Sequence, residues 1–174
     1  MAVKAILTEP NKILRQVSKS VEKVTKVEQQ LMDDMLETMY AAPGIGLAAV
    51  QIGILKRIIV IDLAKEGEKK KPIFIVNPEI ISKSSDLVSY EEGCLSIPNQ
   101  FAEVERPNTC KIKFLDYEGN NKELEAKGLL STCIQHEIDH LNGILFIDYL
   151  SKLKKEMIIK KVKKQKKEID RVVV

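Results

Sequence analysis

The sequence predicts an α+β fold in a single domain of residues 1–174. Three observations predict it: the length suits one domain, short β-branched runs fill the middle of the chain, and segments with helical periodicity lie towards its ends. No Gly/Ser-rich or Pro-rich linker and no internal repeat divides the sequence. We therefore expect strands and helices segregated along the chain rather than a wound parallel sheet.

The first two thirds of the chain contain one predicted helix and several predicted strands. Apolar residues at helical spacing predict a helix from about Val27 to Ala41, and Pro43-Gly44 ends the pattern. Short runs rich in β-branched residues predict strands. These runs span residues 57–63, 72–78, 79–90 and 108–126, the last forming a hairpin that turns at Gly119-Asn120.

Helical periodicity returns in the last third of the chain. A helix is predicted from about Leu129 to Leu141, with one apolar stripe, and Asn142-Gly143 ends it. A final helix is predicted from about Ser151. Four apolar residues near its start are expected to dock on the body of the protein: Leu150, Leu153, Met157 and Ile158.

Composition narrows the class of protein. Hydrophobic residues make up 44% and charged residues 30% of the chain, which excludes a disordered protein. No apolar run approaches the ~18 residues of a membrane span, the start lacks a signal-peptide core, and an odd number of cysteines argues against a disulfide framework. We therefore expect a soluble, cytoplasmic protein with reduced thiols, with neither a membrane nor DNA as its partner.

The strongest local chemical signal is HEIDH at residues 136–140, inside the predicted helix. His136 and His140 are the only histidines, and their i, i+4 spacing puts both on one helix face, where they can share a metal ion. Glu137 lies beside them, where a carboxylate can take a proton from metal-bound water. The alternative is a core helix with polar residues, but burying three ionisable groups is costly without compensation.

A catalytic metal of this kind needs a third protein ligand. The extended HExxHxxGxxH pattern fails because Phe146 occupies the place of its third histidine, and Cys133 lies ~7.5 Å too far along the helix axis. Cys94, Cys110 or a carboxylate outside the helix remain. Chemistry favours Cys94, which stands in EEGCLSIP between a glycine that permits close backbone approach and a proline that ends the segment, whereas Cys110 suits a core position.

The segment PGIGLAAVQIG at residues 43–53 matches the GxGxxA pattern of dinucleotide-binding loops. We reject this match because a helix precedes the segment, and too few residues separate it from the strand at Arg57 for a following helix. Two interpretations remain. The segment is either a turn that exposes its backbone and presents the Gln51 amide as a hydrogen-bond donor, or a small-residue loop packed under the sheet.

Three motifs, GIGLAAVQ, EGCLS and QHEIDH, occur in this order and together resemble the signature motifs of the peptide deformylase family. The resemblance covers nearly the whole chain, which would then form one catalytic domain. It implies that the metal is bound by three residues: Cys94, His136 and His140. It also implies that Glu137 is the catalytic acid and base, and that the Gln51 amide and the backbone N–H of Leu95 stabilise the oxyanion.

The resemblance further implies largely antiparallel sheets around the HExxH helix. The implied reaction is removal of the N-formyl group from the N-terminal formylmethionine of newly synthesised polypeptides, with release of formate. Fe(II) is the usual physiological metal of the family, and Zn, Ni or Co are options in an isolated protein. We expect the extended substrate to pair with a strand edge at Gly44, Ile45 and Gly46. Arg106 resembles a basic residue near the family's cleft, although a solvated surface arginine is the default interpretation.

Two other functions share parts of this pattern. A zinc endopeptidase also carries HExxH, but no convincing third ligand follows His140, because Asp148 is close and Glu156 lies in a lysine-rich helix. A non-enzymatic module with a structural metal would be closed by four protein ligands. Its working surface would be the basic C-terminal segment.

Positive charge is concentrated in that segment. Residues 151–174 carry ten Lys or Arg and three acidic residues, whereas the preceding residues carry 18 basic and 22 acidic ones. One interpretation is a solvated helix face that aids solubility. The other is a helix attracted to ribosomal RNA, which would suit an enzyme of nascent chains in a bacterial cytoplasm rather than an organelle matrix.

Overall fold

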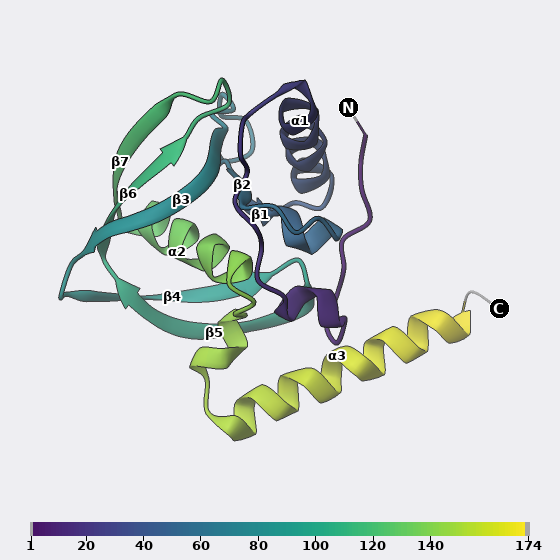
Figure 1. Cartoon of the computed structure of the whole chain (residues 1–174). Coiled ribbons are helices and arrows are strands. Elements are labelled where there is room, and N and C mark those ends of the chain that lie inside the picture. The colour runs from purple at the N-terminus through teal and green to yellow at the C-terminus, as the bar shows by residue number, and fades with distance from the viewer. Residues whose placement is uncertain (1, 173–174) are drawn as a thin grey trace.

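The computed structural model describes residues 2–172 (Figure 1). No helix in this part of the chain combines the length and apolar character needed to cross a membrane. The helices are α1 (Lys26–Ala41), α2 (Leu129–Leu141) and α3 (Lys152–Val172), with short 3-10 helices η1 (Lys12–Arg15), η2 (Ala49–Ile52) and η3 (Phe146–Tyr149). The strands are β1 (Gly46–Ala48), β2 (Ile58–Ile61), β3 (Ile73–Lys83), β4 (Leu87–Cys94), β5 (Ile97–Pro107), β6 (Thr109–Leu115) and β7 (Asn121–Lys127).

Two antiparallel sheets enclose α2. One sheet has the strand order β1-β2-β3-β6-β7, and β4 pairs with β5 as a separate hairpin. Figure 1 shows α2 between the large sheet and this hairpin, with α1 beside β1 and β2. The arrangement confirms the expected α+β fold, with antiparallel sheets around the HExxH helix.

Strand β2 separates the two main apolar layers. All four of its residues are buried, because Ile59 and Ile61 pack with α2 while Ile58 and Val60 pack with α1. The α1 layer contains Met32, Met35 and Met39, and the α2 layer contains Ile134, Ile138 and Leu141. Alternation along one short strand therefore places a helix on each face of the sheet.

Helix α2 begins and ends where the sequence predicts. Gly128 precedes the helix with φ of 62°, and Gly143 follows shortly after it with φ of 74°. Glycine adopts such positive φ angles more readily than other residues. Ten of its 13 residues are buried. Because so little of α2 faces solvent, its polar side chains need partners inside the protein.

The prediction of separate strands at residues 72–78 and 79–90 is wrong in one respect: β3 continues without a break through Pro78. The pairing of β3 with β6 is irregular around Asn77, whose φ is 50°. The Asn77 side chain compensates by hydrogen-bonding both the N–H and the C=O of Val21. A local bulge thus absorbs the proline that would otherwise end the strand.

The sequence does not predict β5. Pro98 lies near the start of this strand and so does not end the segment, contrary to expectation. Only one face of β5 is well buried, through Ile97, Val104 and Arg106, and charged residues alternate with them. This half-buried strand therefore lacks the apolar run by which the other strands are recognised.

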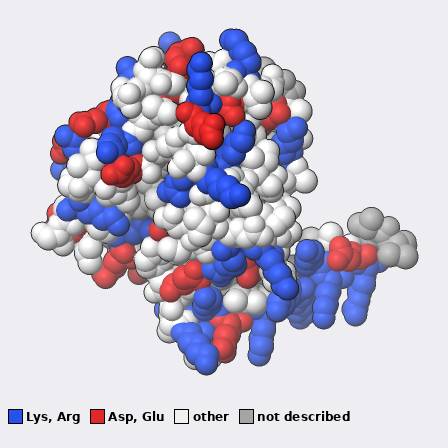
Figure 2. Space-filling model, in the orientation of Figure 1, with Lys and Arg blue, Asp and Glu red and all other residues white. Residues whose placement is uncertain are grey.

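Helix α3 begins where predicted, and two of the four residues expected to dock, Leu150 and Ile158, do contact the body. Ile158 and Val162 are buried in an apolar cluster, and Leu150 packs partly against it. Leu153 and Met157 are 69% and 49% exposed, so the expectation that they dock is wrong. The helix meets the body along the i, i+4 row of Ile158 and Val162, and its lysine-rich remainder projects away (Figures 1 and 2).

Candidate active site

Two separate elements bring three potential metal ligands together. His136 and His140 lie one turn apart on α2, and Cys94 ends β4. The donor atoms of these residues all lie within 4.8 Å of one another, and Cys94 Sγ is 3.2 Å from His140 Nε2. One thiol and two imidazoles at this spacing form a possible site for a single metal ion.

Glu92 fixes the orientation of His136. Its Oε1 lies 2.8 Å from His136 Nδ1, which leaves Nε2 as the nitrogen available to a metal. Burial alone lowers the pKa of His136, but the hydrogen bonds with Cys94 and Glu92 outweigh it and the net shift is upward. Burial and the neighbouring His136 lower the pKa of His140, so the histidine pair favours one positive charge rather than two.

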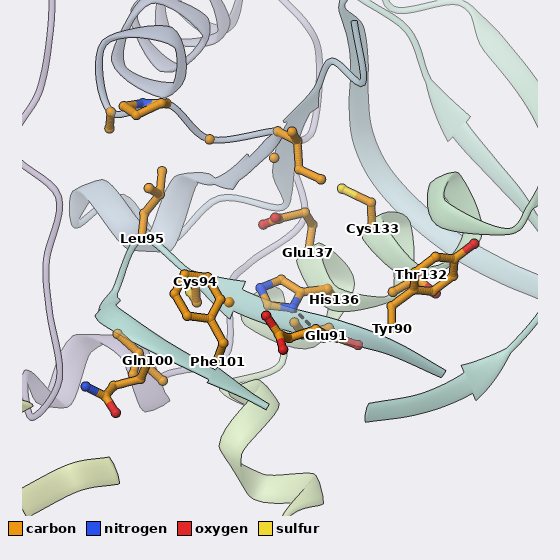
Figure 3. Close-up of a pocket in the computed structure, with 18 of the residues that line it drawn as sticks. Tyr90, Glu91, Cys94, Leu95, Gln100, Phe101, Thr132, Cys133, His136 and Glu137 are labelled. Carbon is orange, nitrogen blue, oxygen red and sulfur yellow. Dashed lines mark hydrogen bonds and ion pairs between the residues drawn. The ribbon is translucent and has the colours of Figure 1, made fainter. Parts of the chain in front are cut away.

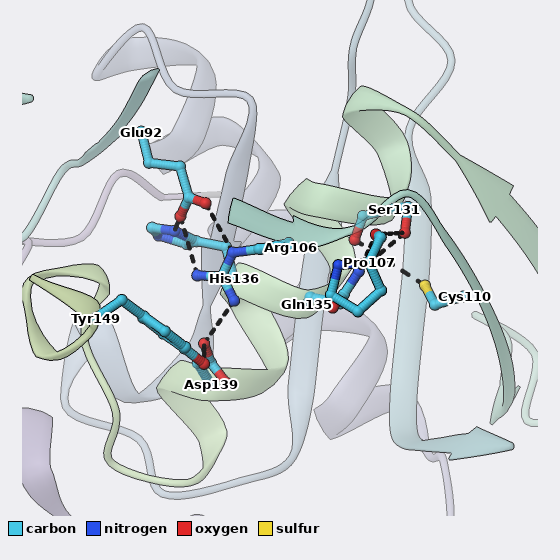
Figure 4. Close-up of polar contacts among 9 residues, drawn as sticks. All are labelled: Glu92, Arg106, Pro107, Cys110, Ser131, Gln135, His136, Asp139 and Tyr149. Carbon is cyan, nitrogen blue, oxygen red and sulfur yellow. Dashed lines mark hydrogen bonds and ion pairs between the residues drawn. The ribbon is translucent and has the colours of Figure 1, made fainter. Parts of the chain in front are cut away.

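A buried charged network lies behind Glu92 (Figure 4). Arg106 Nε and Nη2 donate to the two Glu92 oxygens at 2.7 and 3.0 Å, and Nη1 donates to Asp139 Oδ2 at 2.8 Å. The Tyr149 hydroxyl donates to the same Asp139 oxygen at 2.7 Å. Arg106 is only 3% exposed, so the interpretation as a solvated surface arginine is wrong: two carboxylates compensate its burial.

Sequence reasoning missed Glu92, Asp139 and Tyr149 as parts of the site. A signal existed for Glu92, because two consecutive glutamates on a half-buried strand must point to opposite faces. No spacing in the sequence links Tyr149 to Asp139 across the end of α2. Their contact depends on where η3 folds back.

Glu137 lies beside the possible metal ligands in an apolar setting. Its side chain is buried, and Oε2 has no hydrogen-bond partner among residues 2–172. Burial raises the pKa of Glu137 to about 7, although the charge of His136 opposes the shift. Gly46 approaches it so closely that a Cβ there would contact Glu137 Oε1. A carboxyl group in this state can take up and release a proton near neutral pH.

Gln51 is buried, and two contacts orient its amide. Oε1 accepts a hydrogen bond from the Ala48 N–H at 2.9 Å, which leaves Nε2 pointing to the other side. Nε2 donates to Ser96 Oγ at 3.1 Å and lies 3.5 Å from Cys94 Sγ. The amide N–H is therefore beside the thiol, and its segment contains β1 and η2 rather than an open loop. Leu95 follows Cys94 in the turn between β4 and β5.

The site opens into a pocket of about 490 Å³ (Figure 3). The segment Gly44–Gly46, including Ile45, forms part of one wall, and the β4–β5 hairpin with Phe101 forms part of another. His136 and Glu137 line the pocket from α2. The edge of β1 lies at the wall, and within residues 2–172 β1 pairs with no strand except β2. A strand edge and a reactive carboxyl group therefore meet in one cavity.

The remaining two cysteines lie where the sequence predicts. Cys133 is 6% exposed and packs in the α2 core, although it also lines the pocket, and it is not part of the group of converging ligand atoms. Cys110 is buried in the same core. Neither competes with Cys94 for the histidines.

Comparison with known proteins finds relatives that extend over nearly the whole chain. The family model described as polypeptide deformylase matches residues 3–156. The peptide deformylase of Pelagibacter ubique is 65% identical over 166 residues, which cover 95% of this chain and 96% of the relative.

Solved structures agree with this family. A crystal structure of peptide deformylase from Ehrlichia chaffeensis has a TM-score of 0.92 at 44% identity and covers 96% of this chain and 98% of its own. A second structure from that organism, in complex with actinonin, has a TM-score of 0.91 at 47% identity, with coverage of 95% and 98%.

Replacing Arg106 by Met should destabilise the protein strongly, because it leaves Glu92 and Asp139 without their cation. We expect the free energy of unfolding to fall by about 3–5 kcal/mol in urea titrations. The control is Arg57→Met, since Arg57 bonds to the Leu141 carbonyl and the Asn142 side chain, which are neutral. That variant should lose only about 1 kcal/mol. Equal losses in the two variants would contradict a structural role for the buried network.

Proposed function

The chain belongs to the polypeptide deformylase family, and we propose that Cys94, His136 and His140 bind its metal while Glu137 transfers the proton. Members of this family are metal-dependent hydrolases. The protein removes the N-formyl group from the N-terminal formylmethionine of newly synthesised polypeptides and releases formate. The observation that carries the assignment of residues is the convergence of one thiol and two imidazoles beside a buried, unpaired carboxyl group.

The chemistry of the donors fits a catalytic metal ion. Three protein ligands leave a coordination position open, as catalytic sites require, and the Glu92 contact holds His136 in the tautomer that ligation needs. A thiolate with two imidazoles suits Fe(II), which we propose as the physiological metal, and also accommodates Zn, Ni or Co. When bound, such a metal acts as a Lewis acid and lowers the pKa of water from 15.7 towards about 7.

Glu137 carries the proton in the reaction. The carboxylate accepts a proton from the attacking water and then delivers it to the nitrogen of the departing amine, which becomes the free N-terminus. Its pKa of about 7 suits both steps, because the group exchanges protons in either direction at neutral pH. A side chain at position 46 would intrude on this carboxylate, because a Cβ there would contact Glu137 Oε1.

Two donors stabilise the negative oxygen that forms on the formyl carbon. Gln51 contributes Nε2, which the Ala48 N–H orients through the opposite end of the amide. Leu95 contributes its backbone N–H from the turn that follows Cys94. Pre-oriented donors of this kind each accelerate acyl transfer by about 10²–10³.

The substrate backbone pairs with the edge formed by Gly44, Ile45 and Gly46. The Asp62 N–H donates to the Ile45 carbonyl at 2.9 Å. The Ile45 carbonyl therefore points towards the end of β2 and away from the open edge. In an antiparallel ladder the next residue turns its N–H and C=O to the opposite edge, which gives Gly46 free groups on the pocket side. Backbone pairing accepts any side chains, as an enzyme of many nascent chains requires.

The alternative functions have less support. Asp148 forms ion pairs with Arg15 at 2.5 Å and Lys155 at 2.6 Å, so it is already engaged and is not free to act as the downstream metal ligand of an endopeptidase. Glu156 is exposed on α3. A structural metal would need a fourth ligand, whereas three residues converge within residues 2–172.

Residues 1–174 act as one catalytic domain in the bacterial cytoplasm, where α3 contacts the ribosome. Residues 1, 173 and 174 of this span lie outside the described part of the chain. Bacterial relatives such as that of Pelagibacter ubique support the compartment. The ribosome contact is supported by α3 itself: Ile158 and Val162 hold it on the body, while the lysines of its second half stay exposed.

Replacing Glu137 by Gln should abolish turnover and leave the metal bound, because the amide cannot accept the proton while both histidines remain. We expect kcat for formate release from formyl-Met-Ala-Ser to fall about 10³-fold. Metal content per chain should match the parent by mass spectrometry. Glu91→Gln, at an exposed carboxylate of the same pocket, is the control and should stay active. A Glu137→Gln rate within about tenfold of the parent would show that the base is misassigned.

Metal exchange tests the proposal of Fe(II). Stripped protein is reloaded with Fe(II), Ni(II) or Zn(II), and formate release is followed in air and under argon, with metal content measured in parallel. The iron form should be active under argon and lose activity in air, because Fe(II) and the thiolate are both oxidisable. The nickel form should persist, and the zinc form should be stable but slow. A zinc form that is fastest, with an iron form indifferent to air, would rule out an oxygen-sensitive iron site.

Charge neutralisation on α3 tests the ribosome contact. The variant replaces four exposed lysines by Gln and keeps Val162, so that the helix remains docked: Lys163, Lys164, Lys166 and Lys167. Co-sedimentation with ribosomes should weaken and the salt dependence of binding should become less steep, while kcat/KM on free peptides stays unchanged. Binding that responds neither to these substitutions nor to salt would remove the proposal.

A further inference from the structure

Tyr40 and Asp62 form a partly buried contact just outside the pocket. Tyr40 lies in the last turn of α1, and Asp62 follows β2. The Tyr40 hydroxyl donates to Asp62 Oδ2 at 2.6 Å. Neither residue lines the pocket or touches the possible metal ligands. The mechanism above gives this pair no role.

The Asp62 carboxylate joins three stretches of chain. Besides Tyr40, it accepts hydrogen bonds from the Ala64 N–H at 2.9 Å and the Lys71 N–H at 3.0 Å. Lys70 Nζ lies 3.7 Å from the centroid of the Tyr40 ring. Burial and the Asp62 charge both raise the pKa of Tyr40, so the phenol remains a donor at neutral pH. The contact is thus held from several sides and permanently charge-assisted.

Tyr40 and Asp62 lie close to the two backbone hydrogen bonds that anchor the pocket segment Gly44–Gly46. The Gly44 N–H donates to the Met39 carbonyl at 3.0 Å, next to Tyr40 on α1. At the other end, the Asp62 N–H donates to the Ile45 carbonyl at 2.9 Å. The backbone from Tyr40 to Ile45, the Ile45–Asp62 bond and the Tyr40–Asp62 bond therefore close a ring. The side-chain contact sets the distance between the two anchors of the segment.

The segment needs such anchors because its own side chains cannot hold it. Gly44 and Gly46 carry none, and a Cβ at Gly44 would lie 2.7 Å from Leu95 Cδ1. The intervening Ile45 is 46% exposed. Two glycines in so short a stretch would leave the backbone many conformations. The position of this edge therefore depends on its backbone anchors, which are the Gly44 bond to α1, the Ile45 bond to Asp62 and the start of the β1–β2 ladder.

We propose that the Tyr40–Asp62 hydrogen bond is a positioning contact that holds the Gly44–Gly46 edge in the geometry for pairing with the substrate backbone. It rests on the proposed pairing of substrate with this edge. We expect its effect to be largest for extended substrates, because a longer backbone pairs with more of the Gly44–Gly46 edge. His136 and Gln51 are held by hydrogen bonds to Glu92 and to the Ala48 N–H, and neither bond involves Tyr40 or Asp62.

The test is Tyr40→Phe, which removes the hydroxyl and preserves the ring. For formyl-Met-Ala-Ser we expect KM to rise about tenfold and kcat to stay within about threefold of the parent, since one charge-assisted hydrogen bond organises the edge. For formylmethionine amide, which lacks the following residues, kcat/KM should stay within about threefold. A loss that depends on substrate length is a result that general destabilisation does not produce.

Tyr117→Phe is the matched control. The Tyr117 hydroxyl also donates to an aspartate of α1, Asp33 Oδ2 at 3.1 Å, but this contact lies away from the pocket segment. Thermal melting of both variants should show modest losses, and KM should be unchanged in Tyr117→Phe. The proposal is overturned if Tyr40→Phe leaves KM for the tripeptide unchanged, if both substrates lose equally, or if Tyr117→Phe gives the same rise. A parent that releases no formate at all would instead overturn the proposed function, and the positioning role with it.

Discussion

The site depends on the hydrogen bonds of the Glu92 carboxylate, which lies between Arg106 and His136. This carboxylate joins the β4–β5 hairpin to α2, and Arg106 extends the link to Asp139, one residue before His140. A helix with this many ionisable groups would be costly to bury among isoleucines and leucines. Paired carboxylates and a guanidinium compensate the charge, so α2 can occupy the centre of the fold and still present two histidines.

The site lies where three independently supported elements meet. The helix contributes His136, His140 and Glu137, the hairpin contributes Cys94, and the segment after α1 contributes a strand edge. Glu92 and His136 connect the pocket with the charged network, because both line the pocket and both belong to the network that includes Arg106. The proposed metal ligands and the proposed substrate edge therefore come from different elements of the fold.

The fold was predictable wherever one element had a period of its own. Helix α2 is an example, because its apolar residues repeat with helical spacing, whereas strand β2 was predicted from a short run of β-branched residues. The convergence of Cys94, His136 and His140 was expected from the resemblance of motifs, since chemistry alone left Cys110 or a carboxylate open as the third ligand. Strand β5 and the burial of Arg106 were not predictable, because a half-buried charged strand resembles a surface and its partners are distant in sequence. For α3, the pattern correctly included Ile158, wrongly included Leu153 and did not include Val162.

The open edge of β1 also bears on aggregation. An edge that is open to a substrate backbone, as proposed, is equally open to the same edge of another copy of this chain, which is the first step towards intermolecular sheets. The structure limits this hazard by geometry: β1 has three residues, η2 follows it at once, and Pro43 stands shortly before it. A ladder of three residues offers few hydrogen bonds to a second folded molecule, which disfavours pairing between two copies of the chain.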